Sequence, residues 1–137
     1  GVVDALQQAD LILVAPSNPV VSIGPILAVP GLREALRAAS APVIGFAGIL
    51  GGSPVLGMAH RLLPAIGVDV DAAAVGLHYG ARQRGGVLDA WAMDTADAAA
   101  TDRVLQSGLR VVVTDLIMLD PTSTADFVSY AIKSATS

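Results

Sequence analysis

The segment Leu11–Pro30, LILVAPSNPVVSIGPILAVP, contains the pattern that decides the fold. It opens with five apolar residues, Leu11 to Ala15, and such a run is typical of a strand covered on both faces, as in a parallel sheet. Pro16-Ser17-Asn18-Pro19 then ends the strand, because proline lacks an N–H donor while Ser and Asn bond to nearby backbone. Gly24-Pro25 predicts a turn into a helix that begins with proline. The segment therefore predicts a buried strand, a polar loop and a helix start.

This loop lies where open α/β sheets bind their ligands, in the crevice outside the carboxyl ends of the strands. A helix start at that position presents free N–H groups to an anion. The sequence contains no GxGxxG and no Walker lysine, so no named phosphate motif is present. The spacing alone leaves two interpretations open: a ligand-binding loop, or a tight turn that only connects the strand to the helix.

The rest of the chain alternates strands with helices. We expect further strands at 43–46, 87–93 and 109–113. We expect helices at 2–8, 23–29, 32–39, 58–66, 71–79, 95–106 and 124–134. Right-handed crossovers between such elements give an α/β fold, Rossmann-like, with a mostly parallel sheet and helices on both faces.

The 137 residues predict a single α/β unit, 1–137. The chain begins with GVVDALQQAD, which is typical of the tail of a helix that enters a strand. We therefore expect a fold that is incomplete at its N-terminal side, as in the C-terminal part of a longer domain.

Composition excludes several classes of protein. The chain is 53% hydrophobic but only 4% aromatic, so its core must consist of Ala, Val, Leu and Ile, as in parallel sheets. No apolar run approaches the ~20 residues that a membrane span needs, and we expect no membrane partner. A net charge of −4 argues against a nucleic-acid partner. Without cysteine and with two histidines, the chain offers no disulfide and no histidine-rich metal site, which is compatible with a cytoplasmic protein.

Most individual polar residues have simple structural explanations. Asp69, Asp71, Asp115 and Asp120 fit helix caps or solvated loops better than a catalytic carboxylate pair. His78 lies near a helix end, where a charged imidazole is favourable. No GxSxG nucleophile elbow occurs.

Two loops of small residues remain, and both follow predicted strands. They are Ser17-Asn18…Ser22-Gly24 and Gly51-Gly52-Ser53. In one parallel sheet both would lie at the same edge, where small residues let a ligand approach the backbone. Hydroxyl and amide donors suit phosphate oxygens. The residues alone therefore predict an α/β domain with a rim for an anionic ligand.

At these residues the chain resembles a known family, the 2-phospho-L-lactate (or phosphoenolpyruvate) transferases of coenzyme F-420 biosynthesis. The resemblance is strongest in Ala15–Leu36, APSNPVVSIGPILAVPGLREAL. It continues through Gly51–Ala59, Ala74–Tyr79 and Leu88–Trp91, so it covers essentially the whole chain. The sequence of these motifs is most similar to that of the actinobacterial branch, which uses a phosphoenolpyruvate-derived donor.

The resemblance implies a transferase with two small-molecule substrates. The donor is a lactyl or enolpyruvyl group linked to GDP, and the acceptor is 7,8-didemethyl-8-hydroxy-5-deazariboflavin (Fo). The terminal ribityl hydroxyl of Fo attacks the phosphorus next to the lactyl or enolpyruvyl oxygen, and GMP leaves. The family further implies Mg²⁺ on the diphosphate, with its ligands and a GGTGG loop in an amino-terminal half, and a homodimer.

Carried onto this sequence, the resemblance assigns substrate-binding positions but no catalytic residue and no metal ligand. The assigned positions are Ser17, Asn18, Ser22, Ile23, Gly24, Pro25, Gly51 and Gly52. Ser53 stands where the family pattern has a lysine, a loss that would weaken donor binding by about 1–3 kcal/mol if that lysine touches phosphate. His60 stands where the pattern has an acidic residue. Because this sequence lacks the GGTGG loop, we expect this chain alone to bind poorly and not to turn over.

Two other classes stay open. The same superfamily includes a gluconeogenesis-factor-like group of nucleotide-sugar-binding regulators, but those show a GPGSLYTS-like pattern where this chain has APSNPVVS, so Asn18-Pro19 argues against them. The other class is a structural fragment in which the glycines serve only turns.

Overall fold

The computed structural model describes residues 1–137, and a parallel sheet of four strands lies at its centre. The strands are β1 (Ile12–Val14), β2 (Val43–Phe46), β5 (Ala90–Met93) and β6 (Arg110–Val113). They pair in the order β1-β2-β5-β6, so all four carboxyl ends lie at one edge of the sheet. This confirms the predicted Rossmann-like α/β fold.

Helical segments connect and cover these strands. The α-helices are α1 (Val2–Gln8), α2 (Gly24–Leu27), α3 (Leu32–Ala38), α4 (Ala59–Leu62), α5 (Ala72–Tyr79), α6 (Thr101–Gln106) and α7 (Pro121–Thr136). A π-helical turn η1 (Pro19–Ile23) runs directly into α2, and the 3-10 turns are η2 (Leu63–Ile66), η3 (Arg82–Arg84) and η4 (Thr95–Ala100). A small antiparallel hairpin, β3 (Ile49–Leu50) and β4 (Ser53–Pro54), stands apart from the main sheet.

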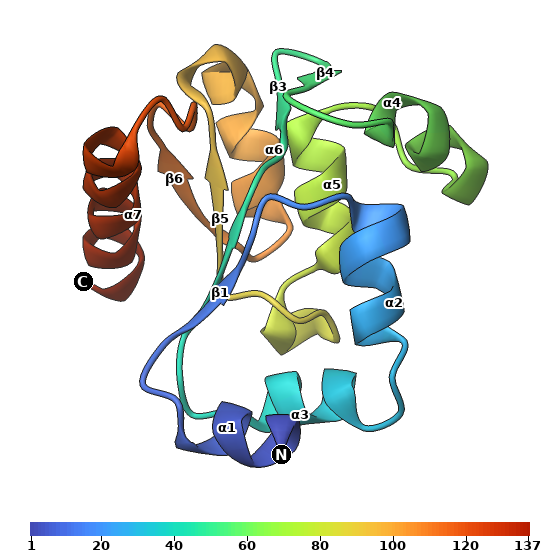
Figure 1. Cartoon of the computed structure of the whole chain (residues 1–137), viewed down its shortest axis with the longest axis vertical. Helices are drawn as coiled ribbons and strands as arrows, with labels where there is room; N and C mark the ends of the chain where they lie inside the picture. The colour runs from blue at the N-terminus through green and yellow to red at the C-terminus, as the bar shows by residue number, and fades with distance from the viewer.

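Helices pack on both faces of the sheet, with α7 on one side and α5 and α6 on the other (Figure 1). On the α7 face, the rings of Phe46 and Phe127 lie 6.1 Å apart. On the opposite face, the rings of Trp91 and Tyr79 lie 5.8 Å apart. Strands β2 and β5 are buried along their whole length, because helices cover both of their faces.

Trp91 is the largest fully buried side chain, and two glycines make room for it. A Cβ at Gly45 would lie 2.8 Å from the indole, and one at Gly76 would lie 2.7 Å from it. The indole N–H donates to the carbonyl of Ala72 at 2.9 Å, which satisfies its only polar atom. Gly45 in β2 and Gly76 in α5 therefore let the strand and the helix approach closely across one ring.

The structure differs from the sequence prediction at the first strand and the first loop. β1 is an edge strand, and Leu13 is 43% exposed, so the expectation that β1 is covered on both faces is wrong. The following helix begins at Pro19 and not at Pro25, because the Asn18 side chain accepts from the N–H groups of its first turn. Gly24 has ordinary helical angles and is not a turn.

The other predicted elements are present, with changes at their ends. The helix predicted at 95–106 is η4 followed by α6, and the one at 58–66 is α4 followed by η2. Helix α7 begins at Pro121, three residues before the predicted start at 124, because Asp120 caps it. The hairpin β3–β4 was not predicted, since each of its strands has only two residues.

No single helix is long and apolar enough to cross a membrane. The segments Pro19–Leu27 and Leu32–Ala38 reach the required length and hydropathy only together, and they are bent by 79° at their break.

Candidate functional site at the carboxyl edge of the sheet

The exit of β1 is a turn held by a backbone hydrogen bond and by the Asn18 side chain. The N–H of Ser17 donates to the carbonyl of Ala15 at 2.7 Å. Asn18 Oδ1 accepts from the N–H groups of Val20 at 2.8 Å and Val21 at 3.3 Å, which is the usual role of a helix N-cap. The amide oxygen of Asn18 is thus engaged, and its NH₂ group is left as a donor. The turn lies at the carboxyl edge, as predicted.

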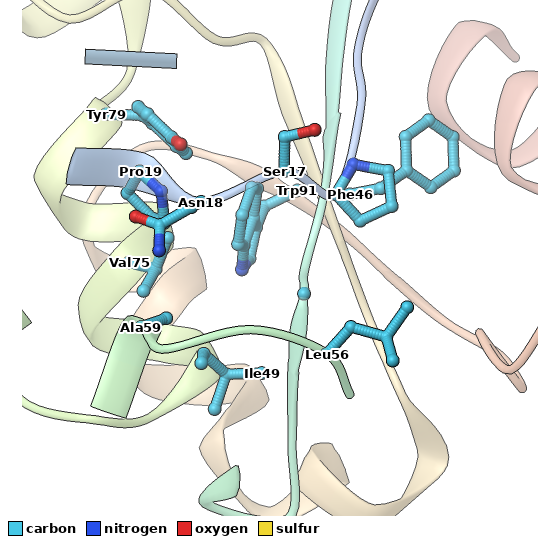
Figure 2. Close-up of a pocket in the computed structure, with 12 residues that line it drawn as sticks. Ser17, Asn18, Pro19, Phe46, Ile49, Leu56, Ala59, Val75, Tyr79 and Trp91 are labelled. Carbon is cyan, nitrogen blue, oxygen red and sulfur yellow. The ribbon is translucent and has the colours of Figure 1, made fainter. Parts of the chain in front are cut away.

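A narrow crevice lies behind this turn, between η1 and α5. Its volume is about 30 Å³, room for one or two water molecules. Figure 2 shows the Trp91 indole in the middle, with Asn18 and Tyr79 beside it and Ile49 and Leu56 at the other end. Burial raises the pKa of the Tyr79 phenol, so this hydroxyl stays protonated at neutral pH. The crevice is closed to a substrate in this conformation, although Ser17 at its mouth is exposed.

The other predicted positions of the first loop lie away from this crevice. Ser22 and Ile23 are half-buried in η1, and Ile23 lines an apolar groove along β1. Gly24 is close-packed, since a Cβ there would lie 2.7 Å from the carbonyl oxygen of Pro19. Pro25 is exposed in the first turn of α2. Of the predicted positions in the first loop, only Ser17 and Asn18 line the crevice, and a ligand role for Ser22–Pro25 stays a prediction.

Gly51 and Gly52 form the exposed turn of the hairpin β3–β4, with φ of 58° and 83°. Only glycine adopts these angles readily, so the turn itself explains both residues. The N–H of Gly51 donates to Asp97 Oδ2 at 3.1 Å and is therefore already engaged. The structure brings this turn to the same edge of the sheet as the β1 exit, and its contact with a ligand stays a prediction.

A second, larger crevice adjoins the first and shares Pro16, Gly48 and Leu56 with it. Its volume is about 220 Å³, and most of the side chains that line it are apolar. The hairpin segment gives one wall and the loop after β6 gives the other. The wall residues are Leu50, Val55 and Leu56 on one side and Leu116, Ile117 and Met118 on the other. We call this space the apolar crevice.

Comparison with known proteins identifies the family of this chain. A sequence model of the family described as 2-phospho-L-lactate transferase CofD matches residues 1–127. The chain belongs to this family.

Its relatives include the phosphoenolpyruvate transferase of Mycobacterium tuberculosis (strain ATCC 25177 / H37Ra), 53% identical over 124 residues, which are 90% of this chain and 36% of the relative. That of Mycobacterium avium (strain 104) is 50% identical over 131 residues, 96% of this chain and 37% of the relative. That of Streptomyces griseus is 48% identical over 135 residues, 98% of this chain and 41% of the relative. The chain thus spans about two-fifths of the length of these relatives.

In this member of the 2-phospho-L-lactate transferase family, sequence reasoning missed the residue that joins the strand exits. Asp94, the one buried charged residue, caps η4 by accepting from the N–H of Ala96 at 2.9 Å. Its other oxygen accepts from the N–H of Leu116 at 2.9 Å, 22 residues further along the chain. Nothing in the sequence around Asp94 indicates the bond to Leu116.

The remaining carboxylates serve the structure as the sequence suggested. Asp71 caps α5 through the N–H of Ala74, and Asp120 caps α7 through the N–H of Ser123. Asp115 is exposed and accepts from the Thr95 hydroxyl at 2.9 Å. It also lines an open groove of about 580 Å³ beside the start of α7.

The residues of this chain do not form a recognisable metal site. No group of three or more His, Asp or Glu side chains is placed so that it could hold an ion. The carboxylates at this edge are occupied by backbone N–H groups or by Thr95. The Mg²⁺ that the family implies therefore finds no fitting set of ligands among these residues.

Proposed function

We propose that this chain is part of a phosphoenolpyruvate transferase that acts on a GDP-linked donor and on Fo. Membership in the 2-phospho-L-lactate transferase family carries the proposal, and the names of the relatives, phosphoenolpyruvate transferases, favour an enolpyruvyl over a lactyl group. In the reaction, the ribityl hydroxyl oxygen of Fo forms a bond to the phosphorus that carries the enolpyruvyl oxygen. The bond from that phosphorus to the oxygen of GMP breaks, GMP leaves, and the hydroxyl proton passes to solvent or to a base.

The caps at the strand exits support a position for the donor near Ser17 and Asn18. Three helical segments start after strands of the sheet, and two of them are capped by the carboxylates of Asp94 and Asp120. The third, after β1, is capped by the neutral amide of Asn18. A diphosphate is repelled by a carboxylate and not by an amide, and the Asn18 NH₂ can donate to a phosphate oxygen. The Ser17 hydroxyl is exposed at the same turn.

The narrow crevice must widen for a substrate to enter behind this turn. Its entrance is bordered by Leu56, which is 89% exposed and lies in an irregular segment between β4 and α4. Loops of this kind change conformation more readily than the packed sheet. We therefore place the reacting groups at the outer surface of the turn, and we expect any part of a substrate that enters behind it to require movement of the 55–58 segment.

We also propose that the Mg²⁺ of the reaction takes its ligands from residues outside this chain, because those present here are engaged. The enzyme would work as a homodimer in the cytoplasm with small-molecule substrates only. Light scattering during gel filtration of the protein expressed from its full reading frame should give the mass of a dimer, and a monomer at working concentration would contradict this.

Product analysis tests the proposal. The protein from its full reading frame, given Mg²⁺, Fo and the GDP-linked enolpyruvyl donor, should form the phosphodiester and GMP in equal amounts by mass spectrometry. The 137-residue chain alone should form neither. Release of GMP without phosphodiester, or no reaction by the full protein, would overturn the proposal. Calorimetric binding of GDP without any binding of Fo would instead favour a nucleotide-binding regulator.

A further inference from the structure

Tyr79 carries a buried hydroxyl group for which the proposed reaction has no use. Only 5% of the residue is exposed, and its ring packs against the Trp91 indole with centroids 5.8 Å apart. The hydroxyl forms no hydrogen bond within the chain, yet no fully enclosed polar side-chain atom lacks a partner, so this oxygen must reach a hollow. A buried hydroxyl without a partner costs free energy, because folding removes the water that bound it in the unfolded chain.

The hollow that the hydroxyl reaches is the narrow crevice. Tyr79 lines this crevice together with Pro16 and Asn18. Figure 2 shows the hydroxyl directed toward the turn that carries Asn18 and Pro19. The volume of about 30 Å³ admits one or two water molecules and excludes any molecule as large as a nucleotide. Water is therefore the ligand whose size fits this hollow.

A water molecule in the narrow crevice has three groups that are free to bind it. The Tyr79 hydroxyl can both donate and accept, since burial raises its pKa and keeps it protonated. The NH₂ group of Asn18 is a free donor, because the amide oxygen accepts from the N–H groups of Val20 and Val21. The carbonyl of Pro16 accepts no hydrogen bond within the chain. Buried water makes roughly two to four hydrogen bonds, which this site can supply.

We propose that the narrow crevice binds a water molecule that bridges the Tyr79 hydroxyl and the Asn18 amide, which makes Tyr79 a positioning residue for Asn18. The helix cap fixes the amide oxygen, and the water fixes the NH₂ group on the other side of the same amide. The turn after β1 is thereby joined to the last residue of α5. The effect of the bridge on ligand affinity rests on the proposed function, which places the donor at Asn18, but the bridge itself does not.

A crystal structure of the protein from its full reading frame tests the bridge directly. At a resolution that shows ordered water, density for a water molecule should lie within about 3.2 Å of both Tyr79 Oη and Asn18 Nδ2. A narrow crevice without such density, or a Tyr79 hydroxyl bonded to another protein group, would overturn the proposal.

Tyr79→Phe tests the same bond in solution, because it removes the hydroxyl and keeps the ring against Trp91. The matched control is Tyr130→Phe, since Tyr130 is 52% exposed in α7 and does not line the narrow crevice. In urea titration of the protein from its full reading frame, Tyr79→Phe should lower the equilibrium constant for folding by about fivefold, the scale of one lost hydrogen bond. Tyr130→Phe should change it by less than about twofold. A Tyr79→Phe variant as stable as the parent, or more stable, would contradict the bridge.

Asn18→Ser separates the bridge from a local effect of the ring. Serine keeps an oxygen that caps the helix start but removes the NH₂ group. Because the water then already lacks one partner, Tyr79→Phe should lower the folding constant by less than about twofold in the Asn18→Ser background. An equal loss in both backgrounds would overturn the bridge, since it would show that the two side chains act independently.

Calorimetric binding of GDP tests whether Tyr79 positions Asn18 for a ligand. Tyr79→Phe should weaken GDP binding by about threefold, less than the loss of a direct bond to phosphate would, and Tyr130→Phe should leave it unchanged. Unchanged GDP affinity in Tyr79→Phe, with GDP bound by the parent, would overturn the positioning role. A parent that does not bind GDP would overturn the proposed function, whereas the bridge would still be decided by the crystal density and the urea titrations.

Discussion

At the two ends of the parallel strands, the helix termini are stabilised by opposite chemistry. At the amino edge, arginine side chains donate to carbonyl groups at the ends of helices. Arg82 binds the carbonyls of Leu36 and Ala39 after α3, while Arg84 and Arg110 bind carbonyls at the ends of α6 and α7. Helix ends present unpaired carbonyls and a negative dipole end, so a guanidinium is the natural partner.

At the carboxyl edge, short acceptor side chains cap the helix starts. Asn18, Asp94 and Asp120 accept from N–H groups in the first turns after β1, β5 and β6. The apolar crevice and the Ser17-Asn18 turn stay open to solvent there. The difference teaches that guanidinium groups join the helix ends at the amino edge, where Arg82, Asp89 and Arg110 line an open polar groove, whereas only short caps order the carboxyl edge, whose crevices have mostly apolar side chains.

The largest effect is expected from removing the Arg82 side chain, which forms most of the hydrogen bonds described at the amino edge. Arg82 donates to both oxygens of Asp89 and to three backbone carbonyls. Arg82→Ala should lower the free energy of unfolding by about 3 kcal/mol in urea titration, because it leaves the partly buried Asp89 carboxylate and those carbonyls without this hydrogen-bond partner.

The matched control is Arg82→Lys, which keeps the charge but not the forked geometry, and it should lose less stability than Arg82→Ala. In both variants the affinity for GDP of the protein that remains folded should be unchanged. If the folded Arg82→Lys variant lost affinity for GDP, GDP would bind at the amino edge, which would contradict a ligand site at the carboxyl edge.

The next largest effect on stability is expected where Gly76 packs against the buried Trp91 ring. Gly76→Ala should lower the free energy of unfolding by about 2 kcal/mol, because its Cβ would lie 2.7 Å from the Trp91 indole. The Trp91→Phe background should reduce that cost, since a smaller ring leaves space for the methyl group. Additive losses in the double variant, measured by urea titration, would show that the two positions do not press on each other.

Asn18 tests whether the first strand exit serves both the fold and a ligand. Asn18→Ala should cost about 1 kcal/mol of stability through the lost cap. Asn18→Asp keeps the capping oxygen, so its stability in urea should match the parent, but its added charge should weaken GDP binding. If Asn18→Asp binds GDP as well as the parent does, the diphosphate does not lie at this turn.

The smallest effect is a pH dependence at the end of α5. Burial, and after it the positive charge of Arg33, lowers the pKa of His78 below its ordinary 6.5. The unfolded chain then binds more protons than the folded one, so stability falls as the pH drops from about 6.5 through the lowered pKa. His78→Gln should flatten this slope in urea titrations between pH 7 and pH 5, whereas the control His60→Gln should keep it. An unchanged slope in His78→Gln would contradict this assignment.

Much of the fold could be predicted because the signals are local. Val43–Phe46 is apolar at every position except a glycine and is buried throughout, as expected for a central parallel strand. Gly67 and Gly80 directly follow the helices predicted at 58–66 and 71–79, and both have a positive φ that ends the helix. The start of the helix after the first loop was misplaced because both Pro19 and Pro25 suit a first helical turn, and only the Asn18 bonds decide between them.

The features that shape the candidate site could not be predicted, because they join residues far apart in the sequence. Asp97 and Gly51 are 46 residues apart, and Asp94 and Leu116 are 22 apart. Neither pair leaves a periodic pattern in the sequence. The exposed apolar walls of the crevice could not be predicted either, because the sequence alone does not distinguish Leu56 and Met118 from core residues.

Hydrogen–deuterium exchange tests most directly whether the carboxyl edge is the ligand edge. The protein from its full reading frame would be compared alone and with saturating GDP and Fo. We predict slower exchange in peptides that cover 16–21, 48–56 and 114–118, and no change in 36–41 and 82–89, where the Arg82 network lies. Slower exchange confined to the Arg82 network, with the strand exits unchanged at full occupancy, would contradict this account.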